Sequence, residues 1–137
     1  MDRVLIDTNV CLDAALRRGP FAAAATELLS RSESGKYTGF VAAHSFDTIF
    51  YLLAKRYSRT NVYKALTGLR KAVRVSPVNE QVIDQALDLN WKDFEDAMQY
   101  ASAIQTDCQA VVTRNTDDFS GSKLPVFTPE KFLEQFR

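Results

Sequence analysis

The sequence of 137 residues has few of the residues that stabilise small secreted domains or bind zinc. Two cysteines, Cys11 and Cys108, are too few for a disulfide framework and lack metal-ligand spacing, so we expect reduced thiols. His44 is the only histidine, which excludes zinc sites built from several histidines. No apolar run approaches the ~18 residues of a membrane span, and no basic and apolar leader precedes the first expected strand. We therefore expect a cytoplasmic protein that does not enter a membrane.

The composition is that of an ordinary globular chain, with 46% hydrophobic and 25% charged residues. The length predicts one domain over residues 1–137, large enough to bury about two-thirds of its unfolded surface. Seventeen basic and seventeen acidic residues give no net charge. Net charge alone therefore gives no sign of a nucleic-acid partner.

Short apolar runs alternate with helical patterns along the chain. The runs predict strands at Val4–Ile6, Tyr37–Val41, Val73–Ser76, Ala110–Thr113 and Leu124–Phe127. Apolar residues at helical spacing predict helices at Val10–Arg18, Phe21–Ser32, His44–Leu53, from Thr60 or Asn61 to Ala72, Glu80–Leu89, 94–104 and Pro129–Arg137. This alternation predicts an α/β protein, a three-layer α/β/α sandwich with a central parallel sheet.

Acidic residues recur near the carboxyl ends of the expected strands. Asp7 follows the first strand, and Asp47 is expected in the first turn of the helix after the second. Asp117 and Asp118 follow the fourth strand, and Asp96 begins a helix. Each has a structural alternative. A carboxylate in a first helical turn gains about 0.3–1 kcal/mol from the helix dipole, and Asp7, Asn9 or Asp93 suits a helix cap.

Convergence of these acids at one sheet edge has an electrostatic cost. Two unit charges ~5 Å apart repel by about 3 kcal/mol at an effective dielectric near 20. A purely structural role does not require that penalty, and a divalent cation removes it. Hard oxygen ligands without histidine or cysteine indicate Mg²⁺ or Mn²⁺.

Three motifs together carry a family resemblance. Leu5-Ile6-Asp7-Thr8-Asn9, Asp96-Ala97 on a helix, and Val112-Thr113-Arg114-Asn115 followed by Asp118-Phe119 resemble the PIN-domain ribonucleases in order and spacing. The resemblance covers essentially the whole chain. It implies an α/β/α sandwich and a metal-dependent endonuclease that acts on RNA. Many small members of the family are toxins of toxin–antitoxin pairs, so it also implies an antitoxin partner, and we expect a homodimer.

The family pattern implies roles for individual residues. Asp7 matches the acid of the first motif and Asp96 the helix-borne acid. Asp47 stands where the family usually carries a glutamate, and Asn115 where it often carries an aspartate, so Asp117 or Asp118 has to supply the last carboxylate or the site has three acids. The expected catalytic residues are Asp7, Asp47, Asp96 and Asp118; the expected metal ligands are Asp7, Asp96 and Asp118; the expected orienting residues are Thr8, Asn9, Asp93, Thr113 and Asn115.

The charges are unevenly distributed along the chain. Residues 55–74 hold seven basic residues and no acid, whereas residues 80–96 hold six acids and one lysine. A basic helical hairpin beside an acidic pocket suits a polyanion held over a metal site, and the expected RNA contacts are Lys55, Arg56, Arg59 and Lys64. Two solvated helix faces of opposite sign explain the composition equally well.

Three functions compete on the sequence alone. The favoured hypothesis is a metal-dependent endoribonuclease. The second is a catalytically silent PIN-fold module that binds RNA or protein, an alternative supported by the shorter Asp47 side chain and by Asn115. The third, a receiver or haloacid-dehalogenase-type phosphotransfer domain, fits poorly. The phosphatase requires an aspartate where Asn9 stands, and the receiver a lysine where Arg114 stands.

Overall fold

The computed structural model describes residues 2–136 and has a five-stranded sheet at its centre. The strands are β1 (Arg3–Ile6), β2 (Thr38–Ala42), β3 (Arg74–Ser76), β4 (Ala110–Val112) and β5 (Val126–Phe127). Their order is β3-β2-β1-β4-β5, and every neighbouring pair is parallel. Val4, Leu5 and Ile6 of the central strand are fully buried, because helices cover both faces of a parallel sheet.

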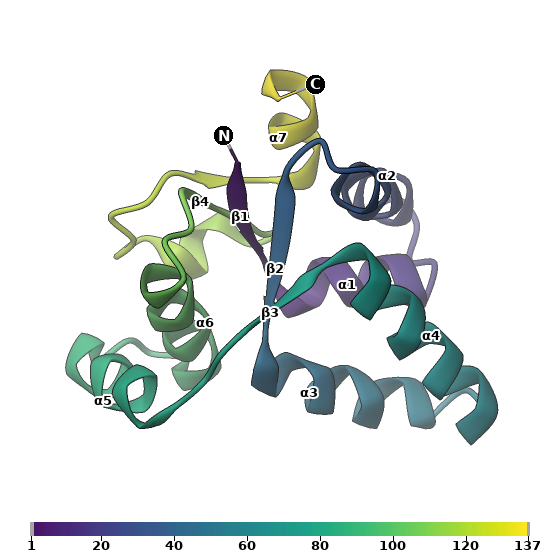
Figure 1. Ribbon diagram of the computed structural model, residues 1–137, viewed down its shortest axis with the longest axis horizontal. Helices are drawn as coiled ribbons and strands as arrows, with labels where there is room; N and C mark the ends of the chain where they lie inside the picture. Colours follow the sequence, from purple (N-terminus) through teal and green to yellow (C-terminus); the bar gives the residue numbers. More distant parts are fainter. Residues whose placement is uncertain (1, 137) are drawn as a thin grey trace.

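Helices form the two outer layers (Figure 1). They are α1 (Thr8–Ala15), α2 (Ala22–Glu33), α3 (Ala43–Ala54), α4 (Arg59–Ala72), α5 (Glu80–Leu89), α6 (Phe94–Gln105) and α7 (Pro129–Gln135), with a 3₁₀ turn, η1 (Thr116–Phe119). Helices α5 and α6 lie on one side of the sheet and α1 to α4 on the other, which confirms the predicted three-layer α/β/α fold. None of the helices in residues 2–136 is long and apolar enough to cross a membrane.

The core lies on both sides of the sheet because successive strand side chains point to opposite faces. Val4 and Ile6 pack with Leu28 and Ile49 on the side of α1 to α4. Leu5 points the other way, into a cluster with Phe40, Tyr100, Val111 and Phe119 beneath α6. Full burial of each such side chain contributes about 1.5–3 kcal/mol. This packing fixes the strand ends from which the polar residues project.

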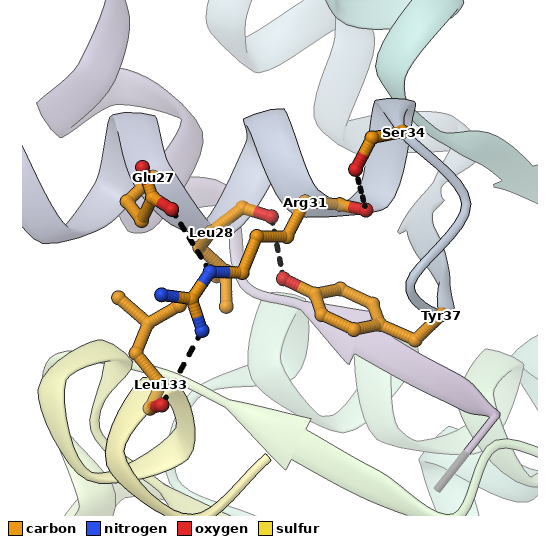
Figure 2. Close-up of polar contacts among 6 residues, drawn as sticks. All are labelled: Glu27, Leu28, Arg31, Ser34, Tyr37 and Leu133. Carbon is orange, nitrogen blue, oxygen red and sulfur yellow. Dashed lines mark hydrogen bonds and ion pairs between the residues drawn. The ribbon is translucent and has the colours of Figure 1, made fainter. Parts of the chain in front are cut away.

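Polar contacts fasten the C-terminal helix α7 to α2 (Figure 2). Arg31 pairs with Glu27 at 2.9 Å between Nε and Oε1, and its Nη1 donates to the Leu133 carbonyl at 3.4 Å. The Tyr37 hydroxyl donates to the Leu28 carbonyl at 2.5 Å, and the Tyr37 ring meets the Phe132 ring edge-on. The end of the chain is thereby held against the first half of the fold.

Two helix starts differ from the sequence prediction. Helix α3 begins at Ala43, so Asp47 lies in its second turn and not in the first as predicted. Helix α4 begins after Ser58, whose Oγ accepts from the Asn61 backbone N–H at 3.3 Å, so the predicted cap at Thr60 or Asn61 is wrong. Both segments offer several adjacent residues that suit a helix start, and the sequence does not distinguish among them.

Helix α6 turns a narrower face inward than predicted. Ala97 and Ala101 are buried against α5, but Phe94 and Ile104, expected in the same apolar stripe, are 41% and 40% exposed. The polar residues Asp96 and Gln99 are buried instead. These two side chains point toward Asp7 at the end of β1.

Candidate active site at the carboxyl edge of the sheet

Strands β1 and β4 are neighbours and end side by side, with Ile6 paired to Val112. The residue after each strand is polar and buried: Asp7 after β1 and Thr113 after β4. The Thr113 hydroxyl donates to Asp7 Oδ2 at 2.7 Å. Two motifs that lie 106 residues apart in the sequence therefore meet in one hydrogen bond, at the edge where open α/β sheets place their ligand sites.

The Asp7 carboxylate is not used as a helix cap. Asp7 stands at the N-cap position of α1 in extended conformation, but its side chain makes no capping hydrogen bond. Its Oδ1 accepts instead from Gln99 Nε2 on α6, at 2.9 Å. The alternative in which Asp7 only caps the following helix is therefore wrong.

Asp96 approaches the same point from α6. It lies in the first turn of that helix, as predicted, and its Oδ1 accepts from the same Gln99 Nε2 at 3.4 Å. The helix is capped by Asp93, whose Oδ1 accepts from the Asp96 backbone N–H at 3.0 Å. The predicted capping role of Asp93 is confirmed, and the cap sets the direction in which Asp96 projects.

Burial and crowding of charge change the acidity of both carboxyl groups. Burial raises the pKa of Asp7, although hydrogen bonds from Thr113 and Gln99 oppose the shift. Burial also raises the pKa of Asp96 to about 7, and the negative charges of Asp7, Asp93, Asp118 and Glu95 add to the increase. Pairs of buried carboxylates with raised pKa are typical of functional sites.

Hydrogen bonds from neighbouring side chains hold the strand ends in place. The Thr8 hydroxyl donates to Ser45 Oγ at 2.7 Å, which joins the start of α1 to the start of α3. The Asn115 backbone N–H donates to Thr113 Oγ1 at 3.1 Å, which orients the loop after β4. Asn9 lies half-buried in the first turn of α1. Thr8, Thr113 and Asn115 thus lie around Asp7.

A cleft of about 600 Å³ opens beside Asp96. Its walls come from the segment before α6 and from η1 with the turn after it. The lining residues are Trp91, Lys92, Asp93, Asp96, Asp117, Asp118, Ser120 and Gly121. Asp117 and Asp118 are both exposed, whereas Phe119 beside them is 1% exposed and anchors η1. Asp96 thus lines an open cleft.

Asp47 lies on a different helix, α3, from Asp96 on α6. Its side chain is exposed in the second turn of α3, and it is not among the charges that raise the pKa of Asp96. A different acid, Glu95, faces α3: Thr48 Oγ1 donates to Glu95 Oε2 at 3.1 Å. No sequence signal distinguishes Glu95, because it is the first acid of a Glu-Asp pair at a helix start.

His44 lies against the same helix start, near Glu95. Neither ring nitrogen of His44 has a hydrogen-bond partner among residues 2–136. Burial lowers the pKa of this imidazole, although the Glu95 carboxylate opposes the shift. Thr48 thus holds the start of α3 to α6, and the half-buried His44 lies beside this contact.

The predicted RNA contacts lie at the far end of the α3–α4 hairpin. Lys55, Arg56 and Arg59 are exposed around the turn between these helices, and Lys64 is exposed on α4. Lys55 is ten residues beyond Ser45, which corresponds to about 15 Å along the helix from the Thr8 contact. RNA that reached both the basic turn at Lys55 and the acids beside Thr8 would run along α3.

A buried ion pair that the sequence analysis missed anchors the loop after β4. Asp13 on α1 is 2% exposed, and its Oδ2 lies 3.3 Å from Arg114 Nε. The Arg114 guanidinium stacks on the Phe21 ring, 4.2 Å from its centroid. Asp13 pairs also with Arg18, at 3.5 Å. No sequence pattern marked this contact, because its partners lie about 100 residues apart.

The donor set fits Mg²⁺ or Mn²⁺. Asp7 and Asp96 each direct a carboxylate oxygen at the amide nitrogen of Gln99. A position between two carboxylates suits positive charge. Among residues 2–136, no three acid, histidine or cysteine side chains form a complete metal-binding group. Mg²⁺ characteristically binds through one or two carboxylates and completes its octahedron with water and substrate phosphate. Two carboxylates beside an open cleft match that requirement.

The fold, the three motifs and the buried acid pair define the class of protein. The model of the PIN domain family matches residues 3–117, and the chain belongs to this family. Among its relatives, Ribonuclease VapC1 of Aquifex aeolicus (strain VF5) is 24% identical over 143 residues, which span 98% of this chain and 96% of the relative.

Solved structures share the fold at low sequence identity. VapBC-1 from nontypeable Haemophilus influenzae aligns with a TM-score of 0.71 and 13% identity over 93% of this chain and 98% of the other. A toxin–antitoxin complex from Klebsiella pneumoniae gives a TM-score of 0.70 and 22% identity over 92% and 97%. Mycobacterium tuberculosis VapC20, a sarcin-ricin loop cleaving toxin, aligns with a TM-score of 0.64 and 19% identity over 79% of this chain and 86% of the other.

Proposed function

We propose that this protein is a metal-dependent endoribonuclease that hydrolyses RNA phosphodiester bonds and is the toxin of a toxin–antitoxin pair. The observation that carries the proposal is the buried pair of carboxylates, Asp7 and Asp96, at the carboxyl edge of a PIN fold. The relative VapC1 of Aquifex aeolicus is a ribonuclease. The structures with the same fold include a toxin and a toxin–antitoxin complex.

The chemistry we propose requires a cation beside the scissile phosphate. Asp7 and Asp96 would hold it, and Asp118 would add a third carboxylate from the open side of the cleft. When bound, Mg²⁺ or Mn²⁺ supplies Lewis acidity and positive charge at the phosphodiester. Thr113 fixes one oxygen of Asp7. Hydrolysis joins a water oxygen to phosphorus and breaks one phosphorus–oxygen ester bond, and one proton of the water ends on the departing oxygen.

A silent binding module is the second candidate. Two observations favour it: Asp47 has a shorter side chain than the family's usual glutamate and is exposed on α3, and Asn115 offers an amide where the family often has a carboxylate. An amide oxygen can bind a cation but cannot neutralise its charge. This candidate retains RNA binding and predicts no cleavage under any metal condition.

We further propose an antitoxin partner, a homodimer and a cytoplasmic location. The antitoxin proposal is supported by the toxin–antitoxin complexes with this fold. The location is supported by Cys11 and Cys108, which are both buried free thiols, as reducing conditions favour. Light scattering of the purified chain measures its mass and tests the dimer.

Cleavage of mixed RNA by the purified chain tests the catalytic proposal. We expect cleavage with Mn²⁺ or Mg²⁺, none with EDTA, and a loss of at least about 100-fold in Asp7→Asn, the scale reported for removal of one charge-stabilising group. Asp88→Asn, an exposed position on α5, is the matched control and retains full activity. Circular dichroism verifies that both variants fold. Asp7→Asn protein that cuts RNA at the wild-type rate contradicts the proposal, and RNA binding without cleavage supports the silent module.

A further inference from the structure

Gln99 is the only residue that touches both carboxylates of the acid pair among the hydrogen bonds of residues 2–136. It lies in the second turn of α6 and is fully buried. A primary amide has two donors and one acceptor oxygen, and burying it without partners is costly. Every polar group of this amide has a partner, so its surroundings are built for it.

The orientation of the amide follows from Thr8. The Thr8 backbone N–H donates to Gln99 Oε1 at 3.1 Å, and the Thr8 hydroxyl is 3.3 Å from the same oxygen. A backbone N–H can only donate. A flipped amide would place its NH₂ against that N–H and its oxygen against two carboxylates. The Nε2 donor therefore points at Asp7 and Asp96.

The helix brings Gln99 and Asp96 to one point. Positions three residues apart lie on the same helix face, so Asp96 and Gln99 both face the end of β1. Asp7 Oδ1 is 2.9 Å and Asp96 Oδ1 3.4 Å from the shared nitrogen. The single amide nitrogen of Gln99 thus holds one oxygen of each carboxylate, and these two charged groups would otherwise repel each other.

We propose that Gln99 is a positioning residue that holds Asp7 and Asp96 in register for a divalent cation. Its N–H donors supply the positive end of a dipole before the cation arrives, and its fixed oxygen prevents the amide from turning away. The inference rests on the proposed function, because it presupposes that the acid pair binds Mg²⁺ or Mn²⁺. It adds a residue to which neither the motifs nor the family resemblance assigned a role.

A space-filling role predicts a different result from a positioning role. Methionine is unbranched and matches glutamine in length, so it occupies the same volume without the donors. If Gln99 only fills space, Gln99→Met leaves cation affinity unchanged. If it positions the carboxylates, affinity falls by about 10- to 100-fold, the usual effect of losing a hydrogen bond to a metal ligand.

Calorimetric titration with Mn²⁺ alone, at pH 8 and without RNA, measures this affinity. The proteins are wild type, Gln99→Met and Gln105→Met. Gln105 is an exposed glutamine at the end of the same helix and serves as the matched control. We expect weaker binding in Gln99→Met only. Mn²⁺ affinity in Gln99→Met within twofold of wild type overturns the inference and leaves the proposed function intact.

A second variant keeps the test informative if Gln99→Met fails to fold. Gln99→Glu keeps an acceptor oxygen for Thr8 but replaces the NH₂ group with an oxygen, which places a third carboxylate beside Asp7 and Asp96. We expect a lower melting temperature in EDTA and a larger rise on adding Mn²⁺ than in wild type. A rise equal to that of wild type overturns the inference. Absence of Mn²⁺ binding by wild type overturns the metal dependence of the proposed function, and the inference with it.

Discussion

Asp96 shows how strongly the fold changes the properties of one side chain. It is 9% exposed, next to a second buried carboxylate, and its pKa is raised to about 7, first by burial and then by neighbouring negative charges. A raised carboxyl pKa destabilises the folded protein at neutral pH, because the charged form is the unfavourable one. Such a cost is typical of functional sites, in agreement with the role that we propose for Asp96.

The pH dependence of Asp96→Asn stability follows from this shift. An aspartate in an unfolded chain has a pKa of ~3.9, so between that value and about 7 the folded protein binds more protons than the unfolded chain. The contribution of Asp96 to wild-type stability therefore falls as the pH rises through this window. Asp96→Asn removes the effect, and its melting temperature relative to wild type should increase from about pH 4 to about pH 8.

Thermal unfolding in EDTA at several pH values measures the difference. Asp88→Asn, on the exposed side of α5, controls for the loss of one negative charge. A difference between Asp96→Asn and wild type that does not change with pH would contradict the prediction.

At the residue scale, some neighbours were predictable from the sequence and others were not. Asp7 and Thr113 follow buried strands, and the carboxyl ends of parallel strands share one edge, so their proximity follows from the fold class. Gln99 has no such signal, because a single polar residue in a helix is normally solvated. Asp47 falls in the second turn of α3 and not in the first because the helix begins at Ala43, slightly before the predicted start, and adjacent residues there suit a helix start equally well.

At the scale of elements, the short turn η1 carries two acids that line the cleft, Asp117 and Asp118, and only one of them acts on Asp96. Phe119 is buried beneath it, and the Asp118 backbone N–H donates to the Asn115 carbonyl at 3.0 Å. The Asp118 charge raises the pKa of Asp96, whereas Asp117 is not among the groups that do so. The turn therefore brings Asp118 closer to the acid pair electrostatically.

Alanine substitutions in η1 should have unequal effects on RNA cleavage. We expect Asp118→Ala to lower the rate by at least about 10-fold, by loss of a charged group near the cation, and Asp117→Ala to leave it nearly unchanged. Asn115→Asp should leave a working enzyme with altered Mn²⁺ affinity. Rates at saturating Mn²⁺ and calorimetric titration check these outcomes. A greater effect at Asp117, or none at either position, would favour a site without a carboxylate from η1.

At the scale of the whole molecule, charge is separated between two faces of the sheet. The basic residues lie on α4 and at its junction with α3, whereas most acids of residues 80–96 lie on α5 and α6. The alternation of strands and helices predicted the parallel sheet, but not the strand order that sets the distance between these faces. Lys55, at the turn of the basic hairpin, lies about 15 Å along α3 from Ser45, which contacts Thr8 beside Asp7.

The salt dependence of RNA binding tests the role of that hairpin. Replacing Lys55, Arg56 and Arg59 with alanine should reduce the slope of log affinity against log salt by about 2, since each contact to a single strand contributes about 0.7. Binding is measured with Asp7→Asn protein to prevent cleavage. An unchanged slope would show that the RNA follows another path.

The position of β1 at the centre of the sheet has a consequence during protein synthesis. Its neighbour β4 lies more than 100 residues later, and the Asp7–Thr113 hydrogen bond joins groups 106 residues apart. A nascent chain carries Asp7 long before its partners on α6 and β4 emerge from the ribosome, and such distant strand pairs form late in folding. The nuclease that we propose would therefore acquire its cutting site only after α6 and β4 have emerged from the ribosome and packed against β1.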